Sequence, residues 1–194
     1  CVLLMSHVGN WQAAAHMLKQ DMPHIPLMLY MGQVQKQQIE KAQKATLADA
    51  GVRIVAVAES GGSPFDIVEG VNFLRNGGIV SLTGDRSWRR DQRRVAARFL
   101  GDRIQLPEAP YILALMGRAP LIFFFATRTA RGRYHISASP PHHLKPATRQ
   151  ERRAAVQAAA QAYAEALEAA VRAHPLQWYH FDSIFEPPDE VPER

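Results

Sequence analysis

The chain opens with the stretch CVLLMSHVGNWQ, residues 1–12, and this stretch decides the fold. Its first five residues are apolar and predict a short buried strand. Gly9 and Asn10 predict a turn, and the side chain of Asn10 is suited to cap a helix that begins at Trp11. His7 therefore stands between the carboxyl end of a strand and the N-terminus of a helix, where open α/β sheets bind their ligands.

The rest of the chain alternates short apolar runs with amphipathic or alanine-rich segments. The apolar runs predict strands, and the segments between them predict helices that end at glycine or proline. The predicted strands span residues 2–6, 25–31, 52–58, 79–83, 95–99, 121–127 and 134–139. The predicted helices span residues 11–21, 33–50, a segment from Pro64 to the glycines at 77 and 78, 107–116 and 150–173. This order predicts an α/β fold, with a mostly parallel central sheet flanked by helices on both faces and an antiparallel hairpin near its end.

The composition is that of a globular chain with anionic partners. Its 194 residues are 47% hydrophobic and 21% charged, which excludes collagen, wholesale disorder and a coiled coil. The net charge is +5, and 18 of the 23 cationic residues are arginine. Cys1 is the single cysteine, which excludes a disulfide-stapled secreted fold and favours a reducing compartment.

Length and composition predict one domain over residues 1–185 and a flexible tail rich in proline and acidic residues over residues 186–194. Because the chain begins inside an apolar run and without methionine, we expect the domain to be truncated at its N-terminus. No apolar run approaches the ~18–20 residues that a membrane-spanning helix needs.

The histidine at the end of the first strand has two interpretations on the residues alone. An imidazole has an ordinary pKa of ~6.5 and can act as a general base near neutral pH. Gln12, five positions after His7, lies in the first helical turn and could reach back to fix the ring. The alternative is that His7 is a polar residue that merely closes a strand.

Five blocks of sequence, in order, resemble motifs of one enzyme family. The stretch from His7 to Gln12 resembles the His-x-x-x-x-Asp/Glu motif of the bacterial lipid A secondary acyltransferases, within the lysophospholipid acyltransferase superfamily. The other blocks are GGIVSLTGDR at 77–86, Arg94-Val95 with Phe99-Leu100-Gly101, the Pro-x-x-Pro-x-x-Leu-Ala helix at 107–114 and the Ala-Pro-Leu-Ile strand at 119–122. Residues 175–185, PLQWYHFDSIF, are closest to the predicted acyltransferase branch associated with aryl-polyene-type lipids.

The resemblance implies transfer of a fatty acyl group from acyl-CoA or acyl-carrier protein to a hydroxyl of a lipid or glycolipid, without a cofactor or metal. It also implies a place at the cytoplasmic face of the bacterial inner membrane, on an anionic surface, reached peripherally or through a missing N-terminal segment. The catalytic residues that it implies are His7, Gln12, Asp85 and Arg86. The substrate-binding residues that it implies are Gly9, Asn10, Trp11, Arg94, Phe99 and Gly101. Donors for the oxyanion would be the amides of the turn at residues 9 and 10, or the cation at position 86.

Position 12 departs from the family's motif, because Gln12 stands where the family has Asp or Glu. An amide accepts a hydrogen bond but cannot stabilise an imidazolium. Three hypotheses follow: a carboxylate such as Glu59, Asp66 or Asp85 substitutes, the enzyme is slow or altered, or the change has disabled it. On the motif alone, Gln12→Glu should raise turnover and His7→Ala should abolish it.

Seven arginines lie within residues 86–103. Guanidinium groups bind phosphate in pairs of hydrogen bonds, so a phosphate-bearing substrate or headgroup fits them, although charge runs are also common on solvated loops. Two other classes of function stay open: a catalytically impaired homologue that binds lipid or acyl-CoA, and a basic nucleic-acid-binding module. The second would use arginines with Trp88 and Trp178, but no nucleic-acid motif is present and Trp178 lies in a segment that we expect to be packed.

Overall fold

A six-stranded sheet forms the centre of the computed structural model, which describes residues 1–32, 46–57, 64–87 and 92–185. The strand order is β3-β2-β4-β1-β7-β8, and every neighbouring pair is parallel except β7 and β8. The strands are β1 (Val2–Met5), β2 (Leu27–Gly32), β3 (Val52–Val57), β4 (Ile79–Thr83), β7 (Leu121–Ala130) and β8 (Arg133–Ala138). This arrangement confirms the expected α/β fold with a mostly parallel sheet.

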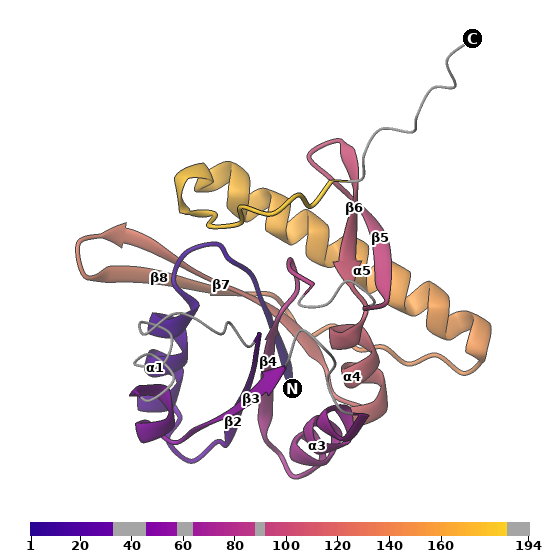
Figure 1. The fold of residues 1–194 in the computed structure, drawn as a ribbon, viewed down its shortest axis with the longest axis horizontal. Coiled ribbons are helices and arrows are strands. Elements are labelled where there is room, and N and C mark those ends of the chain that lie inside the picture. Colours follow the sequence, from indigo (N-terminus) through magenta and orange to yellow (C-terminus); the bar gives the residue numbers. More distant parts are fainter. Residues whose placement is uncertain (33–45, 58–63, 88–91, 186–194) are drawn as a thin grey trace.

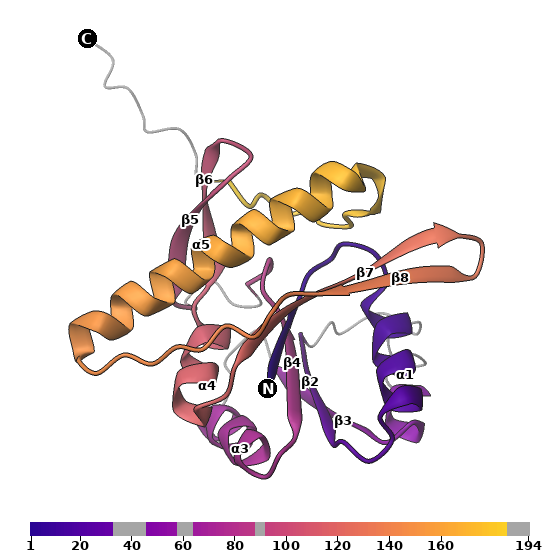
Figure 2. The same ribbon diagram turned by 180° about the vertical axis from the view of Figure 1, so that it is seen from behind.

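Helices cover both faces of the sheet, as the sequence predicts. They are α1 (Trp11–Asp21), α3 (Pro64–Arg75), α4 (Ala109–Gly117), α5 (Arg149–Ala173) and the short 3-10 helix η1 (Pro175–Gln177). Alternate residues of β1 enter two separate cores: Val2 and Leu4 pack with α3, α4 and α5, whereas Leu3 and Met5 pack with α1. Figures 1 and 2 show α1 on one side of the sheet and the other helices opposite it. The central strand is thus buried on both faces.

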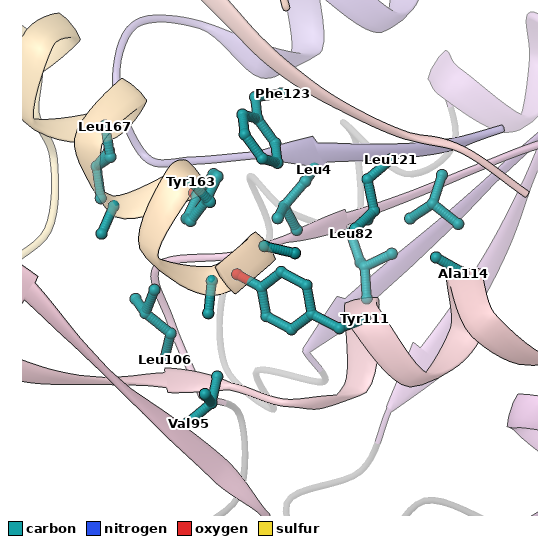
Figure 3. Packing of buried hydrophobic residues seen from close by; sticks show 14 of the residues in the cluster. Leu4, Leu82, Val95, Leu106, Tyr111, Ala114, Leu121, Phe123, Tyr163 and Leu167 are labelled. Atoms are coloured by element: carbon teal, nitrogen blue, oxygen red, sulfur yellow. The ribbon is translucent and has the colours of Figure 1, made fainter. Parts of the chain in front are cut away.

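Two tyrosines fill the larger core behind the end of β1. Tyr111 of α4 and Tyr163 of α5 are fully buried, and Figure 3 shows both packed among aliphatic side chains from the sheet and helices. The Tyr163 hydroxyl donates a hydrogen bond of 2.8 Å to the backbone oxygen of Met5. Burial raises the pKa of both hydroxyls, so they remain protonated. The Tyr163 bond fastens α5 to the end of β1, two residues before His7.

A two-stranded hairpin, β5 (Arg94–Phe99) and β6 (Asp102–Pro107), lies outside the main sheet. The sequence predicts β5 but leaves residues 102–106 unassigned and begins a helix at 107, so β6 is a correction. Leu100 and Gly101 both have positive φ, of 54° and 96°, as a two-residue type I′ turn requires. Ile104 and Leu106 alternate with polar residues and are fully buried.

Side chains of α5 occupy the open edge of β5. Gln157 donates to the carbonyl oxygen of Ala96, and the amide of Gln161 bonds both the N–H and the C=O of Arg98. Glu168 accepts from the N–H of Leu100 at 2.7 Å. These bonds take the place of a third strand, because an unpaired strand edge would otherwise expose its polar groups. They hold the hairpin against the helix that also supports β1.

Two expected segments fall mainly outside the described residues: the tail at 186–194 and the helix at 33–50. Of that helix only residues 46–50 are described, and residues 46–49 are helical. Within the four described ranges, no helix combines the length and the apolarity that a membrane span requires.

Gly9 provides a test of how tightly the turn after β1 is packed. It has φ +75°, and a Cβ at this position would overlap the carbonyl oxygen of Ala126. Gly132 is the matched control, because its φ is +70° but a Cβ there meets nothing within 4 Å. We expect Gly132→Ala to lower the free energy of unfolding by about 1–2 kcal/mol through backbone strain. Gly9→Ala should lower it by roughly 1–3 kcal/mol more, because the overlap adds to the strain. Urea denaturation measures both, and equal losses would contradict the packing described here.

Candidate active site

The ends of the two central strands bring a histidine and an aspartate together. Met5 at the end of β1 pairs with Thr83 at the end of β4, so residues two positions beyond each strand become neighbours. The Nδ1 atom of His7 lies 2.9 Å from Oδ1 of Asp85. The backbone N–H of His7 also donates to Oδ2 of the same carboxylate, at 2.8 Å. The pair therefore has two contacts although 78 residues separate its members.

The carboxylate of Asp85 is fully buried, with 0% of its side chain exposed. A third donor reaches it from the C-terminal part of the chain, where the indole N–H of Trp178 lies 3.3 Å from Oδ2. Burial raises the pKa of Asp85, but the hydrogen bonds and the charge of His7 outweigh burial and hold the pKa below its ordinary value. Asp85 is thus an ionised carboxylate inside the protein.

The contact with Asp85 determines which ring nitrogen of His7 is free. An ionised carboxylate only accepts hydrogen bonds, so Nδ1 carries a proton, and in the neutral form of the ring it is Nε2 that has the lone pair. No hydrogen bond to Nε2 is present within the described ranges, and 21% of the His7 side chain is exposed. The ring can therefore take a proton from a group that approaches from solvent.

The closing segment, residues 175–182, lies against this pair. It forms a short antiparallel contact with the turn after β1: Gly9 N–H donates to the oxygen of Gln177, and Tyr179 N–H donates to the oxygen of His7, at 2.8 and 2.9 Å. His180 donates from Nε2 to the backbone oxygen of Asp85 at 3.0 Å. Figure 1 shows the closing segment, in yellow, leaving the end of α5 and running back toward β5 and β6.

Trp178 and His180 also belong to the candidate active site, although the sequence does not indicate this. The sequence identifies Trp178 only as a packed residue and assigns no role to His180. The ring of His180 meets the ring of His7 edge to face at a centroid distance of 5.8 Å. No local spacing links either residue to Asp85, which lies more than 90 positions earlier in the chain. The chain order PLQWYHFDSIF, within the family resemblance, is the signal that could have drawn attention to them.

The structure corrects the expectation for position 12. Gln12 lies in the first turn of α1, and among the described residues no hydrogen bond joins it to His7. Nδ1 of His7 is bonded to Asp85 instead, which is one of the three carboxylates that could substitute for the family's acidic residue. Glu59 and the side chain of Asp66 lie outside the part of the chain that the structure describes.

The polar groups of the turn after β1 form hydrogen bonds within the protein. Asn10 caps α1 with its side-chain oxygen, and Trp11 is half-buried against the core beneath α1. The amides of Gly9 and Asn10 were expected as oxyanion donors. Both are already engaged, since each donates at 2.8 Å to a backbone oxygen. The structure thus leaves neither amide free for a ligand.

The remaining expected residues divide into exposed cations and structural positions. Arg86 directly follows Asp85 and pairs with Asp182 at 2.9 Å, with 47% and 58% of the two side chains exposed. Arg94 is exposed at the start of β5. Phe99 is fully buried and packs against the ring of Trp178 at a centroid distance of 5.4 Å, so it supports the site from behind. Gly101 lies in the turn between β5 and β6, and its positive φ explains why glycine occupies this position.

The arrangement suits proton transfer. A partly exposed imidazole is oriented by a buried carboxylate, which is the relation between base and orienting acid in several classes of hydrolase and transferase. Among the residues that the structure describes, no three His, Cys, Asp or Glu side chains gather as a metal site requires.

Comparison with known families matches residues 1–186 to the family described as bacterial lipid A biosynthesis acyltransferase. Comparison with curated proteins finds no match.

The substitution His7→Ala should reverse the pH dependence of the contribution that Asp85 makes to the free energy of unfolding. In the wild type the pKa of Asp85 is lowered on folding, so its stabilising contribution is present above the unfolded pKa and is lost as the pH falls through the folded value. In His7→Ala, burial becomes the main influence and raises the folded pKa. The contribution of Asp85 is then present at acid pH and lost as the pH rises through that raised value.

We therefore expect the stability difference between wild type and His7→Ala to grow from about pH 4 to about pH 7. Urea unfolding at the two pH values measures it. His135→Ala is the matched control, because His135 is exposed on β8 and distant in sequence from the pair. A difference that is the same at both pH values would contradict the coupling of His7 and Asp85.

Proposed function

Because the chain belongs to the bacterial lipid A biosynthesis acyltransferase family, it is an acyltransferase, and we propose that it moves a fatty acyl group from acyl-CoA or acyl-carrier protein to a hydroxyl of a lipid or glycolipid. The family supports an acyl donor and a lipid acceptor in general terms. We place the reaction at the cytoplasmic face of the bacterial inner membrane, where an acyl thioester and a lipid acceptor can meet.

One observation carries the mechanism: the 2.9 Å contact between His7 Nδ1 and Asp85, which leaves Nε2 as a base. Nε2 takes the proton of the acceptor hydroxyl while the hydroxyl oxygen attacks the carbonyl carbon of the thioester. The carbon–sulfur bond then breaks, and the same proton passes from the ring to the departing thiolate. Asp85 stays ionised throughout and stabilises the imidazolium between the two transfers. The reaction needs no acyl-enzyme.

The negative oxygen that develops on the thioester carbonyl needs a positive or donating group. Since the amides of Gly9 and Asn10 are engaged, we assign this part to Arg86, which follows Asp85 in the chain. Its partner Asp182 is more than half exposed, and exposed ion pairs are worth little, so the guanidinium can exchange this carboxylate for a substrate. The phosphate of a headgroup or of phosphopantetheine is the other group that Arg86, with Arg94, is suited to bind.

The position of Asp85 bears on the hypothesis of a catalytically impaired homologue. That hypothesis rests on Gln12, which lacks the charge that stabilises an imidazolium. Asp85 supplies a buried, ionised carboxylate at the same ring nitrogen. The geometry therefore favours an active enzyme over a binding protein.

Replacing either member of the pair should abolish most of the activity. Purified protein is incubated with acyl-CoA and lipid acceptor, and release of free thiol is followed. Asp85→Asn keeps the shape of the side chain but removes its charge, and we expect turnover to fall by roughly 10⁴-fold with little change in KM. His7→Ala should reduce turnover at least as much. Thiol release by His7→Ala at the wild-type rate would refute the mechanism.

Adding a carboxylate at position 12 should have little effect, in contrast to what the motif alone predicts. Nδ1 of His7 already has an ionised partner, so we expect Gln12→Glu to change turnover by less than about threefold, the size of a screened charge effect. The same substitution made together with Asp85→Asn tests whether the two positions are equivalent. Restoration of activity in that double variant, or a large gain in Gln12→Glu alone, would return the role to position 12.

A further inference from the structure

The closing segment has two faces with different chemistry. From residue 178 to residue 181 its side chains alternate, as in an extended strand. Trp178 and His180 reach the buried Asp85. Tyr179 and Phe181 are exposed, at 55% and 90%. Leu176, just before them in η1, is 93% exposed. One face of the segment completes the candidate active site, and the other presents apolar side chains to solvent.

The closing segment carries the most exposed large apolar side chains of the described surface. Eight large hydrophobic side chains are exposed within the described ranges, and the three most exposed are those of Leu176, Phe181 and Tyr179. Single exposed apolar residues need no explanation, but a cluster marks an interaction surface. Leucine and phenylalanine that protrude almost completely are suited to enter a soft apolar layer. Tyrosine is the residue that often lies at the boundary between such a layer and water.

Arginines flank these side chains at both ends of the segment. Gln177 bonds both the N–H and the C=O of Arg128, at 2.7 and 2.9 Å, and so joins the segment to the β7–β8 hairpin beside Leu176. The hairpin also carries the exposed Arg131 and Arg133, and residues 121–138 contain no acidic residue. At the other end, Arg86 pairs with Asp182 next to Phe181.

We propose that the exposed face of the closing segment and the tip of the β7–β8 hairpin dock on a bilayer that contains anionic phospholipids. Leu176, Tyr179 and Phe181 enter the interface, and the arginines bind lipid phosphates. The arrangement also brings the candidate active site to the surface that supplies its lipid acceptor, and in this respect it rests on the proposed function. The docking itself needs no catalysis and can be measured separately.

Flotation with lipid vesicles tests the docking. Purified protein is mixed with vesicles of phosphatidylcholine alone, or of phosphatidylcholine with phosphatidylglycerol, and the bound fraction is measured at low and high salt. We expect binding to the anionic vesicles that weakens with salt. The double variant Leu176→Ser and Phe181→Ser should lose at least about a hundredfold in partition coefficient, because each side chain gives up burial worth about tenfold or more.

Two further variants separate the contributions. Met22→Ser with Met116→Ser is the matched control, because these side chains are 46% and 47% exposed but lie outside the closing segment and the hairpin, and its binding should equal that of the wild type. Arg128→Gln with Arg131→Gln and Arg133→Gln should lose the preference for anionic vesicles. Thermal unfolding of each variant checks that it folds.

The outcomes distinguish this proposal from the proposed function. Equal binding by the Leu176/Phe181 variant and its control would overturn the docking surface, as would a wild type that floats with neither kind of vesicle. Self-association that the same variant abolishes, without vesicle binding, would assign the surface to a second copy of the chain instead. Vesicle binding as predicted, together with no thiol release by the wild type, would leave the docking standing and reject the catalytic proposal.

Discussion

The burial of one carboxylate constrains the whole candidate active site. A charged group removed from water is costly unless its lone pairs are occupied, and Asp85 meets this requirement with three donors from two distant parts of the chain. The turn after β1 provides two of them and the closing segment provides the third. The parallel register of β1 and β4 and the support of Phe99 behind Trp178 both serve to hold these donors in place. The same bonds that make the ionised form tolerable also orient the imidazole that would act as base.

Much of the fold could be predicted because its signals are local. The apolar run at the start of the chain, the cap at Asn10 and the glycines after α3 each fix an element end through chemistry within a few residues, and the structure places those ends within one or two positions. β6 was missed for an equally physical reason. It follows its partner after a two-residue turn that includes Leu100 at positive φ, and leucine is not a residue that signals such a turn.

The candidate site was only partly predictable, because the order of the strands in the sheet determines which of its residues contact one another. His7 could be identified from its place between a strand and a helix, and Asp85 from its place after another strand. Their contact depends on β1 and β4 being neighbours, which no local spacing reveals. Gln12 was the expected partner of His7 because the two residues are close in sequence, whereas Asp85, which bonds the ring, is close to it only in space. Trp178 and His180 could not be linked to Asp85 for the same reason, although the order PLQWYHFDSIF within the family resemblance points to their segment.

The long separations within the site also determine when it can form. Its contacts join residue 7 to residue 85, and residue 85 to residues 178 and 180, so closing them requires most of the chain to be in place. During synthesis, domains fold from the N-terminal side as the chain emerges from the ribosome. The sheet and its helices can then be built while the carboxylate of Asp85 still lacks its indole donor. A nascent chain that has not yet released its closing segment would have the α/β framework and both members of the catalytic pair, but the buried carboxylate would still lack its third donor. We expect the pair to reach its final arrangement only when the closing segment docks.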